Sequence, residues 1–262
     1  MIDIWNNGLY YPLLNALVFF YKITGNFGWS IVVLTSLLRV LTTPLVFSSL
    51  KASKKMQDLA PDIAKLKDKH KDDKQALMTA QSELFKEHGL SPAAGCLPQI
   101  LQIVVLIALF NAFNVVLSTP ASEIVSKVNP LLYSVNKLAE GTVLSTQFFS
   151  WNLIKPDVYS LPGLHLPIPG FLLLASALIQ FLSSKMMMPE NKTKVDPNDA
   201  MAASQEQMVY MFPLMTILFG AQFPSGLVLY WFVFSLLSMI QQYFVSGWGG
   251  LSPWLKRLGM LK

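Results

Sequence analysis

The sequence has few charged residues and almost no cysteine. Only 13% of its 262 residues are charged, whereas soluble domains carry roughly 25%. Cys96 is the only cysteine, which excludes a scaffold of disulfide bonds. The charge is also uneven, because residues 51–92 hold 16 of the 35 Asp, Glu, Lys and Arg residues. The remainder has too few charges for a surface in water, so the sequence indicates a membrane protein with one charged, water-soluble insert.

Motifs of catalysis are missing as well. The sequence has no glycine-rich phosphate loop, no Cys/His metal cluster and no Gly-x-Ser-x-Gly motif. His70, His88 and His165 are scattered along the chain. We therefore expect no enzyme, no cofactor and no metal site. The formal net charge of +5 does not require a specific nucleic-acid partner, because membrane proteins carry excess Lys and Arg on their cytoplasmic side.

Long uncharged runs predict five membrane-spanning helices. A bilayer core of ~30 Å needs roughly 20 apolar residues per helix. The run 207–255 carries no charge and is long enough for two helices, which the turn formers in residues 223–226 separate. The predicted spans are residues 28–50, 96–117, 167–188, 208–223 and 226–246. The expected fold class is an all-α polytopic membrane protein with a core of five transmembrane helices.

The distribution of Lys and Arg predicts the orientation of these spans. Segments 51–92, 185–208 and 247–262 together hold 15 of the 20 basic residues. Because basic residues are enriched on the cytoplasmic side, we expect the N terminus outside and the C terminus inside. The predicted cytoplasmic parts are then the insert 51–92, the loop 189–207 and the tail 247–262. The predicted extracytoplasmic parts are residues 1–27 and the loop 118–166.

Residues 1–27 are predicted to contain an amphipathic helix that lies in the outer membrane interface. Their apolar residues recur at a spacing of three and four, namely Leu9, Leu13, Ala16, Leu17 and Phe20. Polar residues and Pro12 interrupt the segment too often for a regular span. A short sixth span is the alternative.

The charged insert 51–92 is predicted to form a hairpin of two amphipathic helices. Its two apolar stripes are Met56, Leu59, Ile63 and Leu66, and then Leu77, Ala80 and Leu84. A polar turn at residues 69–73 separates them, and Gly89 is placed to end the second helix. The alternative is a solvated spacer, but a spacer does not need two matched stripes.

Arg39 lies near the middle of the first predicted span. An arginine at the bilayer centre costs about 2.5–3.5 kcal/mol on insertion scales. Thr35, Thr42 and Thr43 lie one turn away on the same helix face. A side chain that extends to the membrane surface is the alternative, but Arg39 is two turns from either interface. The pattern favours a polar pocket around this cation.

Other predicted spans carry polar side chains at helical spacing. They include Gln102 in the second span, Gln180 in the third, and Trp231 and Ser235 in the fifth. Hydrogen bonds between helices would explain any one of these stripes. Because no span contains an acid to neutralise Arg39, we expect a hydrated groove that attracts anionic groups of a polypeptide.

Several motifs resemble the YidC/Oxa1/Alb3 family of membrane protein insertases. The run from Asn26 through Thr35 and Arg39 to Pro44 is similar to the family's first core span. Gly95-Cys96-Leu97-Pro98, Trp151-Asn152-Leu153 and the Gln241-Gln242 pair also match, as does the most specific motif, Phe223-Pro224-Ser225-Gly226-Leu227-Val228-Leu229-Tyr230-Trp231. The matches follow the family's order through nearly the whole chain.

The resemblance implies an insertase of the bacterial inner membrane that is not an enzyme and needs no cofactor. It implies a groove that contains Arg39 and Thr35, with Tyr230 and Trp231 beside the substrate path. It also implies nascent membrane proteins as substrates, the lipid bilayer as surroundings, and the Sec translocon and the ribosome as partners. The tail 247–262 is short, so the ribosome contact is expected at the cytoplasmic loops.

Two other functions fit the composition. A small-solute transporter or channel would be expected to carry coupling carboxylates in its spans, and the predicted spans have none. A non-catalytic assembly scaffold would not need an arginine at mid-membrane, which is costly to maintain.

Overall fold

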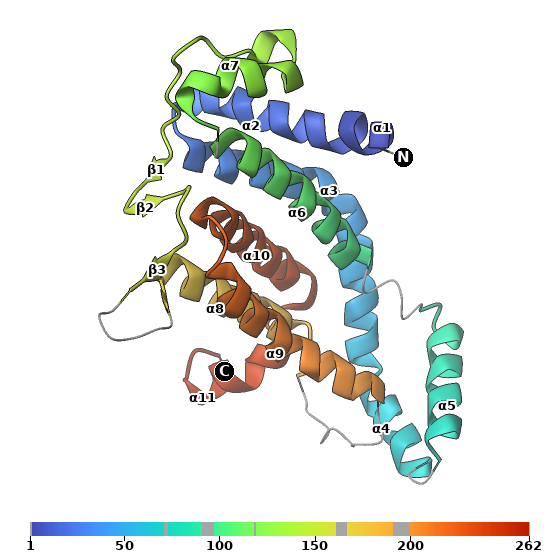
Figure 1. Ribbon diagram of the computed structural model, residues 1–262. Coiled ribbons are helices and arrows are strands. Elements are labelled where there is room, and N and C mark those ends of the chain that lie inside the picture. The colour runs from blue at the N-terminus through green and yellow to red at the C-terminus, as the bar shows by residue number, and fades with distance from the viewer. Residues whose placement is uncertain are drawn as a thin grey trace. The chain divides into compact units, whose positions relative to one another are not determined.

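Helices make up most of the computed structural model, which describes residues 2–70, 73–90, 97–117, 119–160, 167–190 and 200–261 (Figure 1). This helical content confirms the prediction of an all-α fold class. The chain divides into two compact units. The first unit contains residues 1–41, 99–176 and 216–234, and the second contains residues 42–98, 177–215 and 235–262.

The long helices form in the apolar parts of the sequence. They are α2 (Tyr11–Thr24), α3 (Phe27–Asp58), α6 (Leu97–Leu117), α8 (Phe171–Met186), α9 (Ala200–Gly220) and α10 (Ser225–Ser246). Of the described helices, α3 and α10 are long and apolar enough to cross a bilayer, and α8 and residues 102–116 of α6 form shorter apolar helices. Helix α9 begins before the predicted span 208–223, because good helix formers such as Ala202 and Glu206 precede its apolar part.

The shorter elements come before, between and after these helices in the chain. They are α1 (Ile2–Trp5), the π-helix η1 (Asn6–Tyr10), α4 (Ala60–Lys69), α5 (Lys74–Glu87), α7 (Ile124–Lys127) and α11 (Ser252–Arg257), with 3-10 turns at Ala121–Glu123, Asn129–Leu131, Ser134–Asn136 and Gly249–Leu251. The start of the predicted span 96–117 at Cys96 and residues 191–199 of the predicted loop 189–207 lie outside the described residues.

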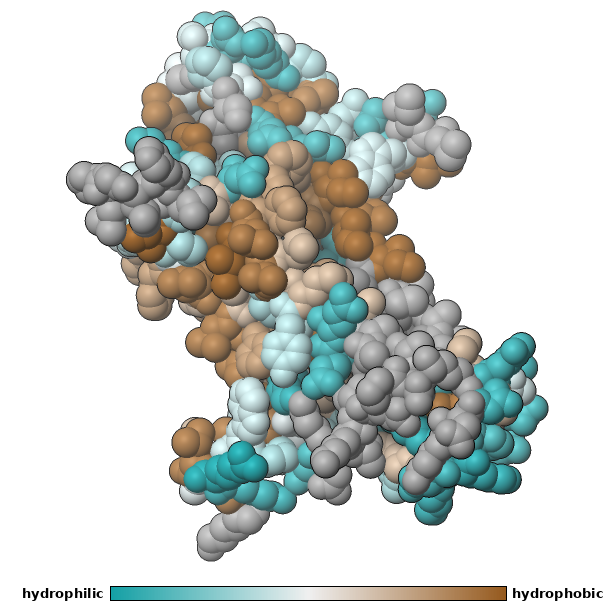
Figure 2. Space-filling model, turned by 60° about the horizontal axis from the view of Figure 1, so that its bottom comes forward, coloured by the Kyte–Doolittle hydropathy of each residue, from teal (hydrophilic) through white to brown (hydrophobic). Residues whose placement is uncertain are grey.

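Many large apolar side chains are exposed on the helices. On α3, Leu37, Val40 and Leu41 face outward, and on α10 Phe244 is 77% exposed. Figure 2 shows hydrophobic residues gathered in broad surface patches. Many exposed large apolar side chains are uncommon on soluble proteins and suit helices whose surroundings are lipid.

In the first unit, two asparagines attach the loop between α6 and α8 to the N-terminal helices. The side chain of Asn15 on α2 donates to the carbonyl of Leu131 at 3.1 Å and accepts from the backbone N–H of Tyr133 at 2.6 Å. The Asn26 side chain accepts from the N–H of Gly28 at the start of α3 and donates to the carbonyl of Gln147 at 2.8 Å. The loop is therefore held by hydrogen bonds to segments more than 100 residues earlier.

This loop also contains two small antiparallel sheets. Strand β1 (Gln147–Phe148) pairs with β2 (Trp151–Asn152), with Phe148 opposite Trp151. Strand β3 (Val158–Tyr159) pairs with β4 (Ile168–Pro169), with Val158 opposite Pro169. The ring of Phe148 packs edge-to-face on Trp29 at 5.5 Å between centroids, so the first sheet covers the N-terminal end of α3.

In the second unit, α4 and α5 lie side by side (Figure 1). Buried Leu59, Phe85 and Leu90 form an apolar cluster between them, and the neighbouring apolar side chains are Ala52, Met56, Ile63 and Leu84. The Asp73 carboxylate caps the N terminus of α5 by accepting from the N–H groups of Gln75 and Ala76. Gly89, which the sequence places at the end of this helix, has a φ of +64°.

Candidate functional site

Arg39 is buried on α3 in the first unit, with only 6% of its surface exposed. Its guanidinium carbon lies 4.5 Å from the ring centroid of Phe234 on α10. A guanidinium above an aromatic face is attracted by the negative face of the ring, and the attraction is stronger where water is excluded. The Phe234 ring therefore helps to hold the Arg39 side chain in place.

Thr35 and Tyr230 are buried in the same unit, each 1% exposed. The Thr35 hydroxyl donates to the carbonyl of Ile31 at 2.6 Å, which satisfies it within the helix. The Tyr230 ring lies 5.9 Å from Phe234, one helix turn away. Among the described residues the Tyr230 hydroxyl has no hydrogen-bond partner. Phe234 thus brings Arg39 and Tyr230 to one place inside the first unit.

Trp231 lies in a separate aromatic group of the first unit. It is half-buried and packs edge-to-face on Phe223 at 5.9 Å. Phe223 in turn packs on Phe110 of α6 at 5.6 Å. Gln102 is half-buried on the same helix, about two turns before Phe110. These contacts connect the turn before α10 with α6.

The two remaining predicted groove residues belong to the second unit. Ser235 is buried on α10, and Gln180 is half-buried on α8. The same unit contains a polar contact between helices, in which the Gln241 amide donates to the Thr43 hydroxyl at 2.8 Å. Next to it, the side chain of Gln242 is 2% exposed.

Sequence reasoning did not identify Phe234 as a site residue. A phenylalanine in an apolar span resembles any residue that faces lipid, so composition gives no signal. The spacing does, because Phe234 follows Tyr230 by four residues and so lies on the same helix face.

Two sequence motifs meet at the start of α10. The Ser225 hydroxyl donates to the carbonyl of Asn152 at 2.8 Å, and the Ser225 N–H donates to the carbonyl of Lys155. The N–H of Gly226 donates to the carbonyl of Leu153 at 3.0 Å. A β-carbon on Gly226 would lie 3.3 Å from that carbonyl oxygen. The loop therefore supplies acceptors for the first N–H groups of α10, which have no partners within the helix.

Asp157 performs the same role for α8. It is buried, and its carboxylate accepts from the N–H of Leu173 at 2.9 Å. Its backbone carbonyl accepts from the N–H of Gly170 at 2.7 Å. A β-carbon at Gly170 would collide with the Asp157 carboxylate, so glycine at this position leaves the carboxylate the space in which it caps the helix.

We expect Asp157→Ala to lower the free energy of unfolding by about 1–2 kcal/mol, the usual effect of removing a helix cap. Asp157→Asn keeps an acceptor and should lose less. Thermal unfolding in detergent measures both, with Glu140→Ala as the control because Glu140 is exposed in the same loop. Equal stability of Asp157→Ala and the control would contradict the capping role.

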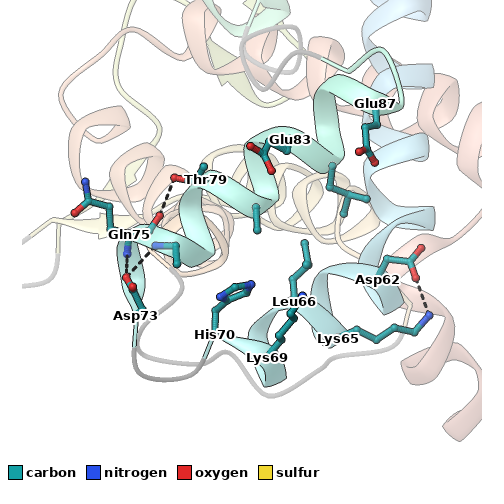
Figure 3. A pocket seen from close by; sticks show the side chains of 13 residues that line it. Asp62, Lys65, Leu66, Lys69, His70, Asp73, Gln75, Thr79, Glu83 and Glu87 are labelled. Carbon is teal, nitrogen blue, oxygen red and sulfur yellow. Dashed lines mark hydrogen bonds and ion pairs between the residues drawn. The ribbon is translucent and has the colours of Figure 1, made fainter.

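A second candidate site is the cleft of about 830 Å³ between α4 and α5 (Figure 3). Its charged lining residues are Asp62, Lys65, Lys69, His70, Asp73, Glu83 and Glu87. The Lys65 ammonium donates to the Asp62 carboxylate at 2.8 Å. That hydrogen bond, and then the charge of Lys65, lower the pKa of the Asp62 carboxyl. The described residues contain no group of three His, Cys, Asp or Glu side chains that could hold a metal ion.

Comparison with known proteins agrees with the sequence motifs. The sequence model of the family described as 60Kd inner membrane protein matches residues 19–249. A protein of Fusobacterium nucleatum named membrane protein insertase YidC is 32% identical over 226 residues, which cover 86% of this chain and 88% of that protein.

Longer proteins with the same name are similar too. The relative from Geobacter sulfurreducens is 30% identical over 92% of this chain and 38% of its own length. The relative from Rickettsia bellii is 30% identical over 90% of this chain and 38% of its own length. The chain thus spans less than two fifths of these two relatives. The family match and the Fusobacterium relative confirm the resemblance seen in the motifs, and the chain belongs to the 60Kd inner membrane protein family.

Proposed function

We propose that this member of an inner membrane protein family is a membrane protein insertase, whose site is the buried Arg39 with Phe234 and Tyr230. The observation that carries the proposal is the burial of a cation against an aromatic ring in an apolar helix. A cation in an apolar helix is costly to bury, and such residues mark functional sites in membrane proteins. Named insertases among the relatives support the same function.

The proposed topology follows the predicted spans. Five helices cross the membrane, with the N terminus outside, the C terminus inside and the N-terminal helices in the outer interface. The pair α4–α5 then lies in the cytoplasm, where its charged cleft is open to water. This arrangement is supported by the Lys and Arg distribution.

The proposed mechanism uses partitioning and needs no nucleotide, cofactor or catalytic residue. A short polar segment of the substrate enters from the cytoplasm, where Arg39 and Tyr230 replace part of its hydration. The adjoining apolar segment of roughly 20 residues moves into lipid, and its burial supplies tens of kcal/mol at about 25 cal/mol per Å². That free energy exceeds the cost of carrying a short polar segment across.

The proposed partners follow from this mechanism. Nascent membrane proteins are the substrates, the ribosome supplies them and the bilayer receives them, and the protein acts alone or with the Sec translocon. We place the ribosome contact at the cytoplasmic loops. The α4–α5 cleft has acids and bases on its lining, which suits transient binding of polar polypeptide segments before insertion.

Site-specific cross-linking tests the proposed path. A photo-reactive amino acid at Trp231, which is half-buried in the first unit, should capture a stalled nascent chain that carries one apolar span. The matched position is Phe244 on the same helix, which is 77% exposed and should capture mainly lipid. Adducts with lipid alone at both positions would contradict the proposal.

A further inference from the structure

After α10 the chain turns back onto the end of α8, within the second unit. Gly249 has a φ of +45°, and a β-carbon there would collide with the carbonyl oxygen of Met186. A β-carbon on Gly250 would lie 2.6 Å from the carbonyl oxygen of Lys185. The two glycines therefore allow the turn η6 (Gly249–Leu251) to pack directly on the backbone at the end of α8.

Side chains then hold α11 on α8. The Lys185 ammonium, on a residue that is 3% exposed, lies 5.5 Å from the ring centroid of Trp254. The Phe181 ring lies 6.0 Å from the same ring. The Lys256 ammonium pairs with the Glu190 carboxylate at 2.9 Å. These contacts give α11 one defined orientation.

The outer side of this segment exposes apolar and basic residues together. Trp254, Leu258 and Met260 are 41%, 72% and 66% exposed. Lys256 and Arg257 are exposed beside them, and residues 247–262 contain no acid. Exposed apolar side chains next to basic ones, with a tryptophan among them, are typical of segments in the membrane interface.

The position of the segment fits that surface. It follows directly after α10 and packs on the end of α8, and both helices are apolar. Where two apolar helices end, a bilayer has its headgroup layer. Tyr243 and Trp248 pack together at the end of α10, with 4.8 Å between ring centroids, and aromatic residues of this kind concentrate in that layer.

We infer that residues 252–260 form an anchor that lies in the headgroup layer and binds anionic phospholipids. Trp254, Leu258 and Met260 would enter the acyl boundary, while Arg257 and Lys256 contact the phosphates. Lys256 forms an ion pair with Glu190, so Arg257 supplies the larger part of the attraction to anionic phosphates. The inference rests on the membrane location of the family and is independent of the insertase activity.

A fluorescent probe at Leu258 tests the anchor in the full chain. Cys96 is the only cysteine, so the variant Cys96→Ser/Leu258→Cys carries one label site. The purified protein is reconstituted in vesicles of phosphatidylcholine with or without phosphatidylglycerol. We expect a water-soluble quencher to reach the probe about fivefold less in the anionic vesicles, since each basic residue near such a surface contributes about that factor.

Two controls separate the anchor from general effects. The probe at Met78, a residue of α5 that is 64% exposed, should be quenched equally in both vesicles. Adding Lys256→Gln and Arg257→Gln to the Leu258 variant should remove the difference between vesicles, as should high salt.

Equal quenching of the Leu258 probe in both vesicles would overturn the inference. Shielding that arises only when ribosomes are added would also overturn it, and would assign the segment to ribosome binding. Because the readout does not depend on insertion of any substrate, neither result bears on the proposed insertase activity.

Discussion

Replacing Arg39 with alanine is expected to reduce insertion of a single-span substrate by about tenfold or more. A hydrogen bond between a charged group and the substrate's polar segment contributes about 1.5–3 kcal/mol, and a barrier raised by about 1.4 kcal/mol corresponds to a tenfold slower rate. Arg39→Lys keeps the charge near Phe234 and should retain much of the yield. The measurement is protection of the substrate's short tail from protease in liposomes that contain only the purified protein.

The control for this experiment is Lys137→Ala, which removes an exposed basic residue from the loop between α6 and α8. It should insert the substrate like the wild type. Full activity of Arg39→Ala would show that the buried cation is not required for insertion. If the wild type protects no more substrate than empty liposomes do, the insertase proposal itself fails for the isolated protein.

The second large effect is expected at Gly28, where a β-carbon would collide with the ring of Phe148. Gly28→Ala should lower the free energy of unfolding by about 1–3 kcal/mol, the usual cost of overpacking. Gly8 has no atom within 4 Å of the corresponding position, so Gly8→Ala is the matched control and should cause no loss. Thermal unfolding in detergent measures both variants.

A double variant separates the collision from other causes. Phe148→Ala removes a buried ring and destabilises by itself, but it also makes room at Gly28. The double variant Gly28→Ala/Phe148→Ala should therefore lose less stability than the two single losses added together. Strict additivity would mean that the ring and the glycine do not interact.

The parts of the site that were predictable are those where a residue contradicts its surroundings. Arg39 is a charge in an apolar run, and Thr35 extends its polar face, so both are visible in the sequence. Phe234 is not, because an aromatic residue in a span is ordinary whether it faces lipid or a guanidinium. Which apolar residues face inward depends on tertiary packing. A helix that is apolar on all sides has no polar face from which its orientation could be predicted.

Local contacts were predictable and distant ones were not. Asp73 and Gly89 act on neighbouring residues at the two ends of α5, so their roles as helix cap and helix end follow from local rules. Asn15 interrupts an apolar pattern in the sequence, whereas in the structure it binds Leu131 and Tyr133. Strands of two residues leave no periodic pattern, so neither sheet was predictable. Contacts between residues more than 100 positions apart have no local signal.

The hydrogen bonds of Ser225 and Gly226 with residues 152–155 can form only late in the folding of the first unit. Residues 152–155 leave the ribosome long before α10 does. The carbonyls of Asn152 and Leu153 therefore have no Ser225 or Gly226 to bind until about 73 further residues have been synthesised. Contacts with such separation form late in folding. The first unit, which includes residues 216–234, is thus completed only after the start of α10 has been synthesised.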